Sequence, residues 1–176
     1  MRQAGKLPAL RAALDIPVVG VVPALKVAAS ASGCGQIGLL ATPATVNRPY
    51  TDNLIREFTV GCQVRRFGSV ELVQWAEDWI ACSREPEHLF AHLNDWLMQP
   101  QPLSHVVLGC THFPLLRPMF EKLWPAIGWV DSGEAIARRV EQLVEQIPDG
   151  KSPAIALFWT GERPPADAVQ RYVATL

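Results

Sequence analysis

The fold class is most easily recognised in the segment His105-Val106-Val107-Leu108-Gly109-Cys110-Thr111-His112-Phe113-Pro114. After His105, the residues Val106-Val107-Leu108 form a short apolar run that is typical of a buried strand, and Pro114 suits the first turn of a helix. A strand that leads directly into a helix is the repeating unit of an α/β protein. The stretch therefore predicts a parallel sheet with Cys110 at the carboxyl end of one strand.

The same alternation of strand and helix continues in both directions along the 176 residues. Strands are predicted at 16–22, 37–41, 63–67, 105–108, 128–130 and 154–158. Helices are predicted at 7–14, 24–30, 70–80, 86–97, 115–123, 134–146 and 165–173, with one more that runs from about Thr45 to Phe58. The fold class is α/β, a parallel sheet with flanking helices. We place a seam near 119–125, after which two β–α units belong to a different sheet.

Composition limits the partners and the compartment. The net charge is −1 and the charged residues are interspersed, so we expect neither nucleic acid nor an anionic membrane surface as a partner. No apolar stretch reaches the roughly 20 residues that span a bilayer, and the amino terminus does not resemble a signal peptide. We therefore expect a cytoplasmic protein whose partners are small molecules or proteins.

Four cysteines are far apart in the sequence, which predicts neither a disulfide framework nor a zinc site. For Cys34, Cys62 and Cys82 we expect the ordinary role of small apolar residues. Cys110 differs because Gly109 permits close approach, and a helix start nearby would favour a thiolate. Polar Thr111 and His112 follow the apolar strand, which packing alone does not require. We therefore favour a chemical role for Cys110.

Two further features each have a functional and a structural explanation. His112 could orient a substrate or hold a proton, or it could simply bond a carbonyl at a helix start. A hydrolase-type Cys–His pair is less expected, because side chains two positions apart in one loop need not converge. Thr42 and Thr45 end another strand and could grip a carboxylate, although helix capping is slightly favoured.

Other polar groups are expected to be structural. Asp131-Ser132-Gly133 is interpreted as capping at a strand end. His88 and His92 have helical spacing but no obvious third ligand, so they are expected to form a polar helix face and not a metal site.

Several segments in the same order resemble glutamate racemase, of the aspartate/glutamate racemase superfamily. They are Leu108–Leu116, Val130–Arg139, Ile37–Val46 and Ile16–Pro23, and the resemblance runs from about Leu7 to at least Thr160. It implies inversion of glutamate at the α-carbon without a metal or other cofactor, which supplies D-glutamate for peptidoglycan. In that chemistry one thiolate removes the α-proton and a second thiol returns a proton from the opposite face.

The resemblance also implies roles for individual residues. Cys110 matches the second catalytic cysteine of the family. Thr111 and His112 match substrate-contacting or supporting positions, and Thr42 and Thr45 match the threonine segment near the substrate. Glu77 resembles the supporting acidic residue, with a solvated helix carboxylate as the alternative.

The sequence departs from the family because the first cysteine with its Asn-Thr, an early Asp-Ser-Gly turn and a Pro-Tyr-Gly segment are not found. We therefore expect 1–15 to be a residual segment of the first domain, 16–118 the largely complete second domain, and 119–176 the C-terminal part of the first. Racemase activity should be impaired, and exposed first-domain surface could cause self-association. Aspartate or another amino acid could replace glutamate. The alternative function is a non-catalytic remnant that binds a small carboxylate or a partner protein.

Overall fold

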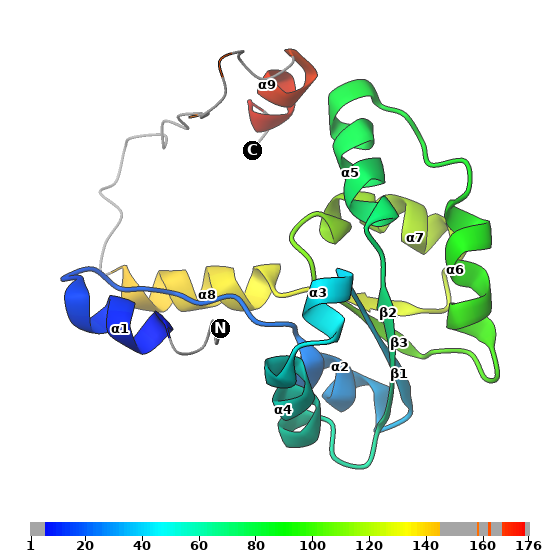
Figure 1. Cartoon of the computed structure of the whole chain (residues 1–176), viewed down its shortest axis with the longest axis horizontal. Coiled ribbons are helices and arrows are strands. Elements are labelled where there is room, and N and C mark those ends of the chain that lie inside the picture. The colour runs from blue at the N-terminus through cyan, green and yellow to red at the C-terminus, as the bar shows by residue number, and fades with distance from the viewer. Residues whose placement is uncertain (1–5, 145–157, 159–161, 163–166, 175–176) are drawn as a thin grey trace.

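A computed structural model of the chain describes residues 6–144, 158, 162 and 167–174. Its centre is a four-stranded sheet in the order β2-β1-β3-β4, and all three strand pairs are parallel. The strands are β1 (Gln36–Ala41), β2 (Gln63–Gly68), β3 (His105–Leu108) and β4 (Gly128–Val130) (Figure 1). The predicted fold class, a parallel sheet with flanking helices, is confirmed.

The register brings the carboxyl ends of the strands to one edge of the sheet. Leu40 of β1 is paired with Phe67 of β2 on one side and with Leu108 of β3 on the other. The chain first places β2 on one side of β1 and then crosses to place β3 on the opposite side. Such a reversal opens a crevice between the two central strands, where ligands of α/β proteins gather.

Helices cover both faces of this sheet (Figure 1). One face packs against α2 (Leu25–Ser32), α3 (Pro43–Val46) and α4 (Pro49–Phe58). The other packs against α5 (Glu71–Cys82), α6 (Leu89–Met98), the 3-10 turn η2 (Phe113–Leu116) and α7 (Arg117–Leu123). These layers give the sheet two separate apolar cores.

Successive side chains of the central strands point alternately into the two cores. Leu39 points into the core beneath α2, whereas its neighbour Leu40 points into the core beneath α5 and α6, and both are fully buried. In β3, Val107 faces the first core while Val106 and Leu108 face the second. Burial on both faces explains why 37–41 and 106–108 contain no polar side chain.

Most predicted elements are confirmed. The strands predicted at 37–41, 63–67, 105–108 and 128–130 are present, and helices cover most of each predicted helical range that the structure describes. The single helix expected to run to Phe58 is two helices. Pro49 lacks an amide hydrogen and holds Arg48 in an extended conformation, which separates α3 from α4.

The predicted buried strand at 16–22 is wrong. This segment forms no strand and pairs with no other strand among the described residues, and Ile16 and Val21 are 66% and 60% exposed. A β-branched run becomes a strand only when a neighbour satisfies its backbone groups, and the described residues provide none here. Of the strand predicted at 154–158, residues 154–157 lie outside the described residues, and Phe158 is in no strand.

The sheet continues past the expected seam near 119–125. β4 pairs with β3 over His105–Val107, so the first of the two late β–α units shares the sheet that was assigned to the earlier residues. The expectation that this unit belongs to a different sheet is wrong. The division into domains at 1–15, 16–118 and 119–176 stays a prediction.

Three helices lie outside the two layers. They are α1 (Lys6–Ala13), α8 (Gly133–Leu143) and α9 (Asp167–Val173), of which α9 contacts α5. Figure 1 shows α8, α1 and the segment between α1 and α2 extending together away from the sheet. The Ser132 hydroxyl, before α8, donates to the Val22 carbonyl at 2.5 Å. Among the helices of the described residues, none is long and apolar enough to cross a membrane.

Candidate functional site

A cavity of about 500 Å³ opens at the carboxyl ends of β1, β3 and β4. Its walls come from the segment before α2, the α3–α4 region, the loop after β3 and the start of α8. The lining residues are Val21, Val22, Pro23, Thr45, Arg48, Tyr50, Thr51, Leu108, Gly109, Cys110, Thr111, Pro114, Asp131, Ser132, Gly133 and Ile136. Of the four cysteines, Cys110 is the one that the structure places on this wall.

Cys110 is held at the cavity by close packing of the strand that precedes it. A β-carbon on Gly109 would lie 3.1 Å from the Ala41 β-carbon and 3.1 Å from a Leu39 methyl carbon. The Gly109 amide donates to the Leu40 carbonyl at 2.8 Å. Glycine therefore lets the end of β3 lie flush against β1, and Cys110 follows directly.

A chain of polar contacts runs from the thiol to α5. Cys110 Sγ lies 3.7 Å from His112 Nδ1, and His112 Nε2 lies 2.8 Å from Glu77 Oε1. Cys110 and His112 do converge, although a spacing of two residues in one loop does not require it. The Phe113 amide donates to the Cys110 carbonyl at 3.2 Å, which closes a tight turn, and buried Phe113 anchors that turn in the core.

This turn also changes the expected support for the thiol. The α-helix predicted to begin at about Leu115 begins at Arg117, and η2 occupies the residues before it. The first α-helical turn is therefore displaced from Cys110. The group that reaches the thiol is the His112 imidazole.

The two threonines do not cap a helix through their side chains. Thr42 is the residue before α3, but its hydroxyl makes no capping bond and lies 2.9 Å from the Thr45 hydroxyl. Thr45 lines the cavity, whereas Thr42 is not among the lining residues. Buried Thr51 donates to the Thr45 carbonyl at 2.6 Å and fixes this turn. The favoured capping interpretation is therefore wrong for both hydroxyls.

The cavity wall contains two residues that sequence reasoning missed, Arg48 and Tyr50. Pro49 restricts Arg48 to its extended conformation, and this brings both side chains to the wall at the start of α4. Burial, together with the charge of Glu57, raises the pKa of the Tyr50 phenol. The phenol is therefore a neutral hydrogen-bonding group at physiological pH. The signal available in the sequence was the position of these residues shortly after a strand end.

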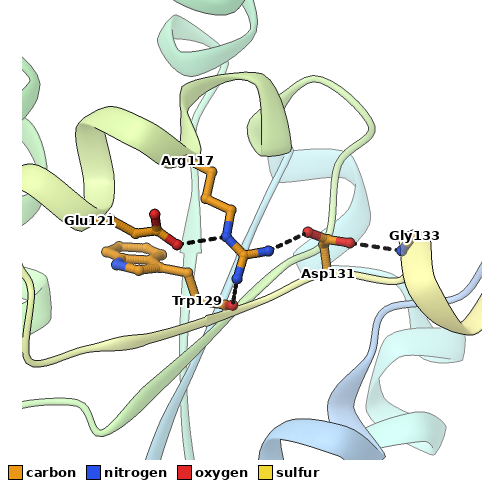
Figure 2. Close-up of polar contacts among 5 residues, drawn as sticks. All are labelled: Arg117, Glu121, Trp129, Asp131 and Gly133. Carbon is orange, nitrogen blue, oxygen red and sulfur yellow. Dashed lines mark hydrogen bonds and ion pairs between the residues drawn. The ribbon is translucent and has the colours of Figure 1, made fainter. Parts of the chain in front are cut away.

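Asp131, which was predicted as a structural cap, has two roles. Its Oδ1 accepts a hydrogen bond from the Gly133 amide at 2.7 Å, so the capping prediction is confirmed. Its Oδ2 lies 3.0 Å from Arg117 Nη1, and Arg117 also donates to Glu121 at 2.8 Å and to the Trp129 carbonyl at 2.8 Å (Figure 2). The bond to Glu121 is the main cause of the raised Arg117 pKa.

The structure thus brings together Cys110, Thr111 and Thr45 at the cavity, while His112 and Glu77 are joined to Cys110 by a chain of contacts and are not among the lining residues. His92 does not lie on a polar helix face as predicted. Its ring packs edge-on against Phe67 and Trp75, and its Nε2 lies 2.9 Å from the Ser69 hydroxyl.

Residues 6–140 match the model of the Asp/Glu/Hydantoin racemase family. The chain belongs to this family. Among curated racemases, the glutamate racemase of Salmonella typhimurium is 52% identical over 149 residues, which cover 83% of this chain and 53% of that protein. The glutamate racemase of Klebsiella pneumoniae is 48% identical over 149 residues, which again cover 83% of this chain and 53% of that protein. The chain therefore spans about half the length of the curated relatives it matches.

Solved racemases show the same fold. Escherichia coli glutamate racemase, in complex with L-glutamate and the activator UDP-MurNAc-ala, matches 96% of this chain and 65% of its own chain, with a TM-score of 0.84 and 42% identity. Glutamate racemase of Campylobacter jejuni matches 96% and 66%, with a TM-score of 0.60. At 21% identity the latter supports the racemase fold alone.

Proposed function

We propose that this chain provides one proton-transfer thiol, Cys110, of a glutamate-racemase-type site. The observation that carries the proposal is the Cys110–His112–Glu77 chain at a strand-end cavity, in a member of a racemase family. The proposed reaction is exchange of the α-proton of an amino acid. Glutamate is the first candidate substrate because the curated relatives described above are glutamate racemases, and aspartate is the second.

The geometry suggests how the thiol is prepared. When His112 Nε2 carries the proton that Glu77 accepts, Nδ1 is left as an acceptor that faces the thiol at 3.7 Å. Glu77 therefore selects the tautomer that can draw the Cys110 proton. The resulting thiolate removes the α-proton of the substrate, and the protonated thiol can return it to the same face. This route uses no metal and no other cofactor.

The remaining cavity residues would bind the charged ends of the amino acid. Hydroxyls of Thr45 and Thr111 and the cation of Arg48 suit carboxylates, with Thr42 holding the Thr45 hydroxyl in place. Asp131 lines the same wall and suits an ammonium group. We assign substrate binding to these residues.

Inversion needs a second acid on the opposite face of the α-carbon, and Cys110 is the thiol that the described cavity wall provides. We therefore propose that the 176-residue chain exchanges the α-proton with little or no inversion. In a racemase with both thiols, the same half-site would contribute to D-glutamate supply for peptidoglycan.

The test is incubation of the purified chain with L-glutamate in heavy water, followed by proton NMR and chiral chromatography. We expect the α-proton signal to decay without inversion, the decay to be lost in Cys110→Ala, and the control Cys82→Ala to behave like the unmodified chain. Decay at the same rate in Cys110→Ala would contradict the assignment.

A second candidate is a non-catalytic protein that binds a small carboxylate or a partner protein. The exposed apolar side chains of Val21 on the segment before α2 and Val140 on α8 favour it, because such surfaces promote association. Calorimetric binding of glutamate without proton exchange would support this function. Concentration-dependent sedimentation that Val140→Glu reduces, and the control Val60→Glu does not, would show self-association through this surface.

A further inference from the structure

Cys34 and Cys62 stand at the amino-terminal edge of the sheet, at the opposite end of the strands from the cavity. Cys34 lies two residues before β1 and Cys62 lies one residue before β2. These strands are hydrogen-bonded neighbours in which Gln36 is paired with Gln63, and the Gln63 amide donates to the Gly35 carbonyl at 3.4 Å. Strands of one sheet are about 4.8 Å apart, and the register continued back from Gln36 and Gln63 places Cys62 opposite Gly35, the neighbour of Cys34.

Local contacts turn the Cys34 thiol toward the segment that contains Cys62. The backbone of Cys34 has a φ of 62°, a left-handed conformation that residues other than glycine rarely adopt. Cys34 follows Gly33, which is also left-handed and ends α2. Its Sγ donates to the Val60 carbonyl at 3.6 Å. The Cys62 amide closes the same turn by donating to the Thr59 carbonyl at 3.0 Å. Burial, and then a hydrogen bond with the Cys34 thiol, raises the pKa of Cys62, which is consistent with this proximity.

We propose that Cys34 and Cys62 are a modification site that forms a reversible intramolecular disulfide with a low-molecular-weight disulfide, such as glutathione disulfide, as the oxidant. Exposed Cys34 ionises and attacks one sulfur of the oxidant, which releases one small thiolate and leaves a mixed disulfide on Cys34. The half-buried Cys62 then loses its proton and attacks Cys34 Sγ, and a second small thiol leaves. Two protein thiols are oxidised and one small disulfide is reduced to two thiols.

The disulfide would close a loop over the residues between the two cysteines. This loop includes Thr45, Arg48 and Tyr50, which form one wall of the cavity. Cross-linking the ends of a loop reduces the conformational freedom of the unfolded chain. Oxidation should therefore stabilise the chain, without any reliance on the proposed chemistry of Cys110.

The experiment treats the purified full chain with glutathione disulfide and maps its peptides by mass spectrometry. We expect a Cys34–Cys62 linked peptide that is lighter by two hydrogen atoms, a fall in free thiols from four to two, and a melting temperature that rises by roughly 5–10 °C. Dithiothreitol should reverse all three changes.

Matched variants separate the pair from the other thiols. Cys62→Ser should stop at a mixed disulfide on Cys34, and Cys82→Ser should still form the linked peptide. A stable glutathione adduct on Cys34 of the unmodified chain, or a disulfide that joins two copies of the chain, would overturn the proposal.

Discussion

Helix α6, which covers one face of the sheet, and helix α8, which extends away from it, have similar apolar patterns but differ in burial. Leu93 and Leu97 of α6 are spaced four residues apart and are fully buried. Ile136 and Val140 of α8 have the same spacing, yet α8 has no buried residue. Helical periodicity therefore determines where a helix forms, but burial depends on a facing element. For α6 the sheet is that element, and for α8 the described residues provide no comparable surface.

The largest expected effect is a loss of stability on truncation of a core residue, compared with truncation of a residue on α8. Phe120 is fully buried and stacks on Trp129 with ring centroids 4.6 Å apart. Phe120→Ala should lower the free energy of unfolding by about 3–5 kcal/mol. The matched change Val140→Ala on α8 should alter it by less than about 0.5 kcal/mol. Urea unfolding of both variants measures the contrast, and similar losses would show that α8 packs as firmly as α7.

A functional contrast lies within the well-packed region, on α5. Glu77→Gln removes the acceptor charge that selects the His112 tautomer, so α-proton exchange should fall by at least about tenfold. Asp78→Asn on the same helix is the control, because Asp78 contacts Gln74 and Arg84 away from the cavity. Exchange followed by NMR measures both rates. Equal exchange in Glu77→Gln and the unmodified chain would remove Glu77 from the mechanism.

A smaller effect on stability is expected from removing the arginine of either of two helical ion pairs. Arg117 bonds Glu121, Asp131 and the Trp129 carbonyl and so joins α7 to the end of β4, whereas Arg138 meets Glu134 alone in a pair 3.5 Å apart on exposed α8. Arg117→Met should cost about 1 kcal/mol of unfolding free energy, a figure reduced by solvent screening, and Arg138→Met close to none. Thermal unfolding at low and high salt would test this. A loss for Arg138→Met equal to that for Arg117→Met would contradict it.

The smallest expected effect concerns pH. The folded-state pKa of Cys62 is raised by burial and by Cys34, so the unfolded chain loses this proton first as the pH rises past about 8.5. The stabilising contribution is present below that pH and is lost as the pH rises through the folded-state pKa. Under reducing conditions, unfolding free energy should therefore fall more steeply at alkaline pH in the unmodified chain than in Cys62→Ala. Parallel curves for these two proteins would contradict the shift.

The predictions of helices and strands succeeded where an apolar run in the sequence also has neighbouring elements that cover it in the fold. After their first residues, Gln36 and His105, β1 and β3 contain no polar side chain, because both of their faces are covered, and a short run of that kind is recognisable without the fold. The segment 16–22 has a comparable composition but no strand partner among the described residues, so its prediction failed. Local composition does not show whether a neighbouring strand is present.

The place of the site at the carboxyl ends of the strands was predictable from the sequence, whereas the contacts among its side chains were not. Cys110 and Thr45 were found because both follow strands whose carboxyl ends share one edge. The contact between Cys110 and His112 depends on a tight 3-10 turn, which the spacing of two residues does not specify. Arg48 was missed because its place on the wall depends on the helix break at Pro49.

Whether one thiol serves one face of the substrate is tested most sharply by supplying L-glutamate and D-glutamate separately in heavy water. The α-deuterium content and the configuration of each are then measured. We expect deuterium in L-glutamate, with its configuration retained, and none in D-glutamate. Deuterium in both enantiomers, or formation of the opposite enantiomer by the pure chain, would contradict a single-thiol site at Cys110.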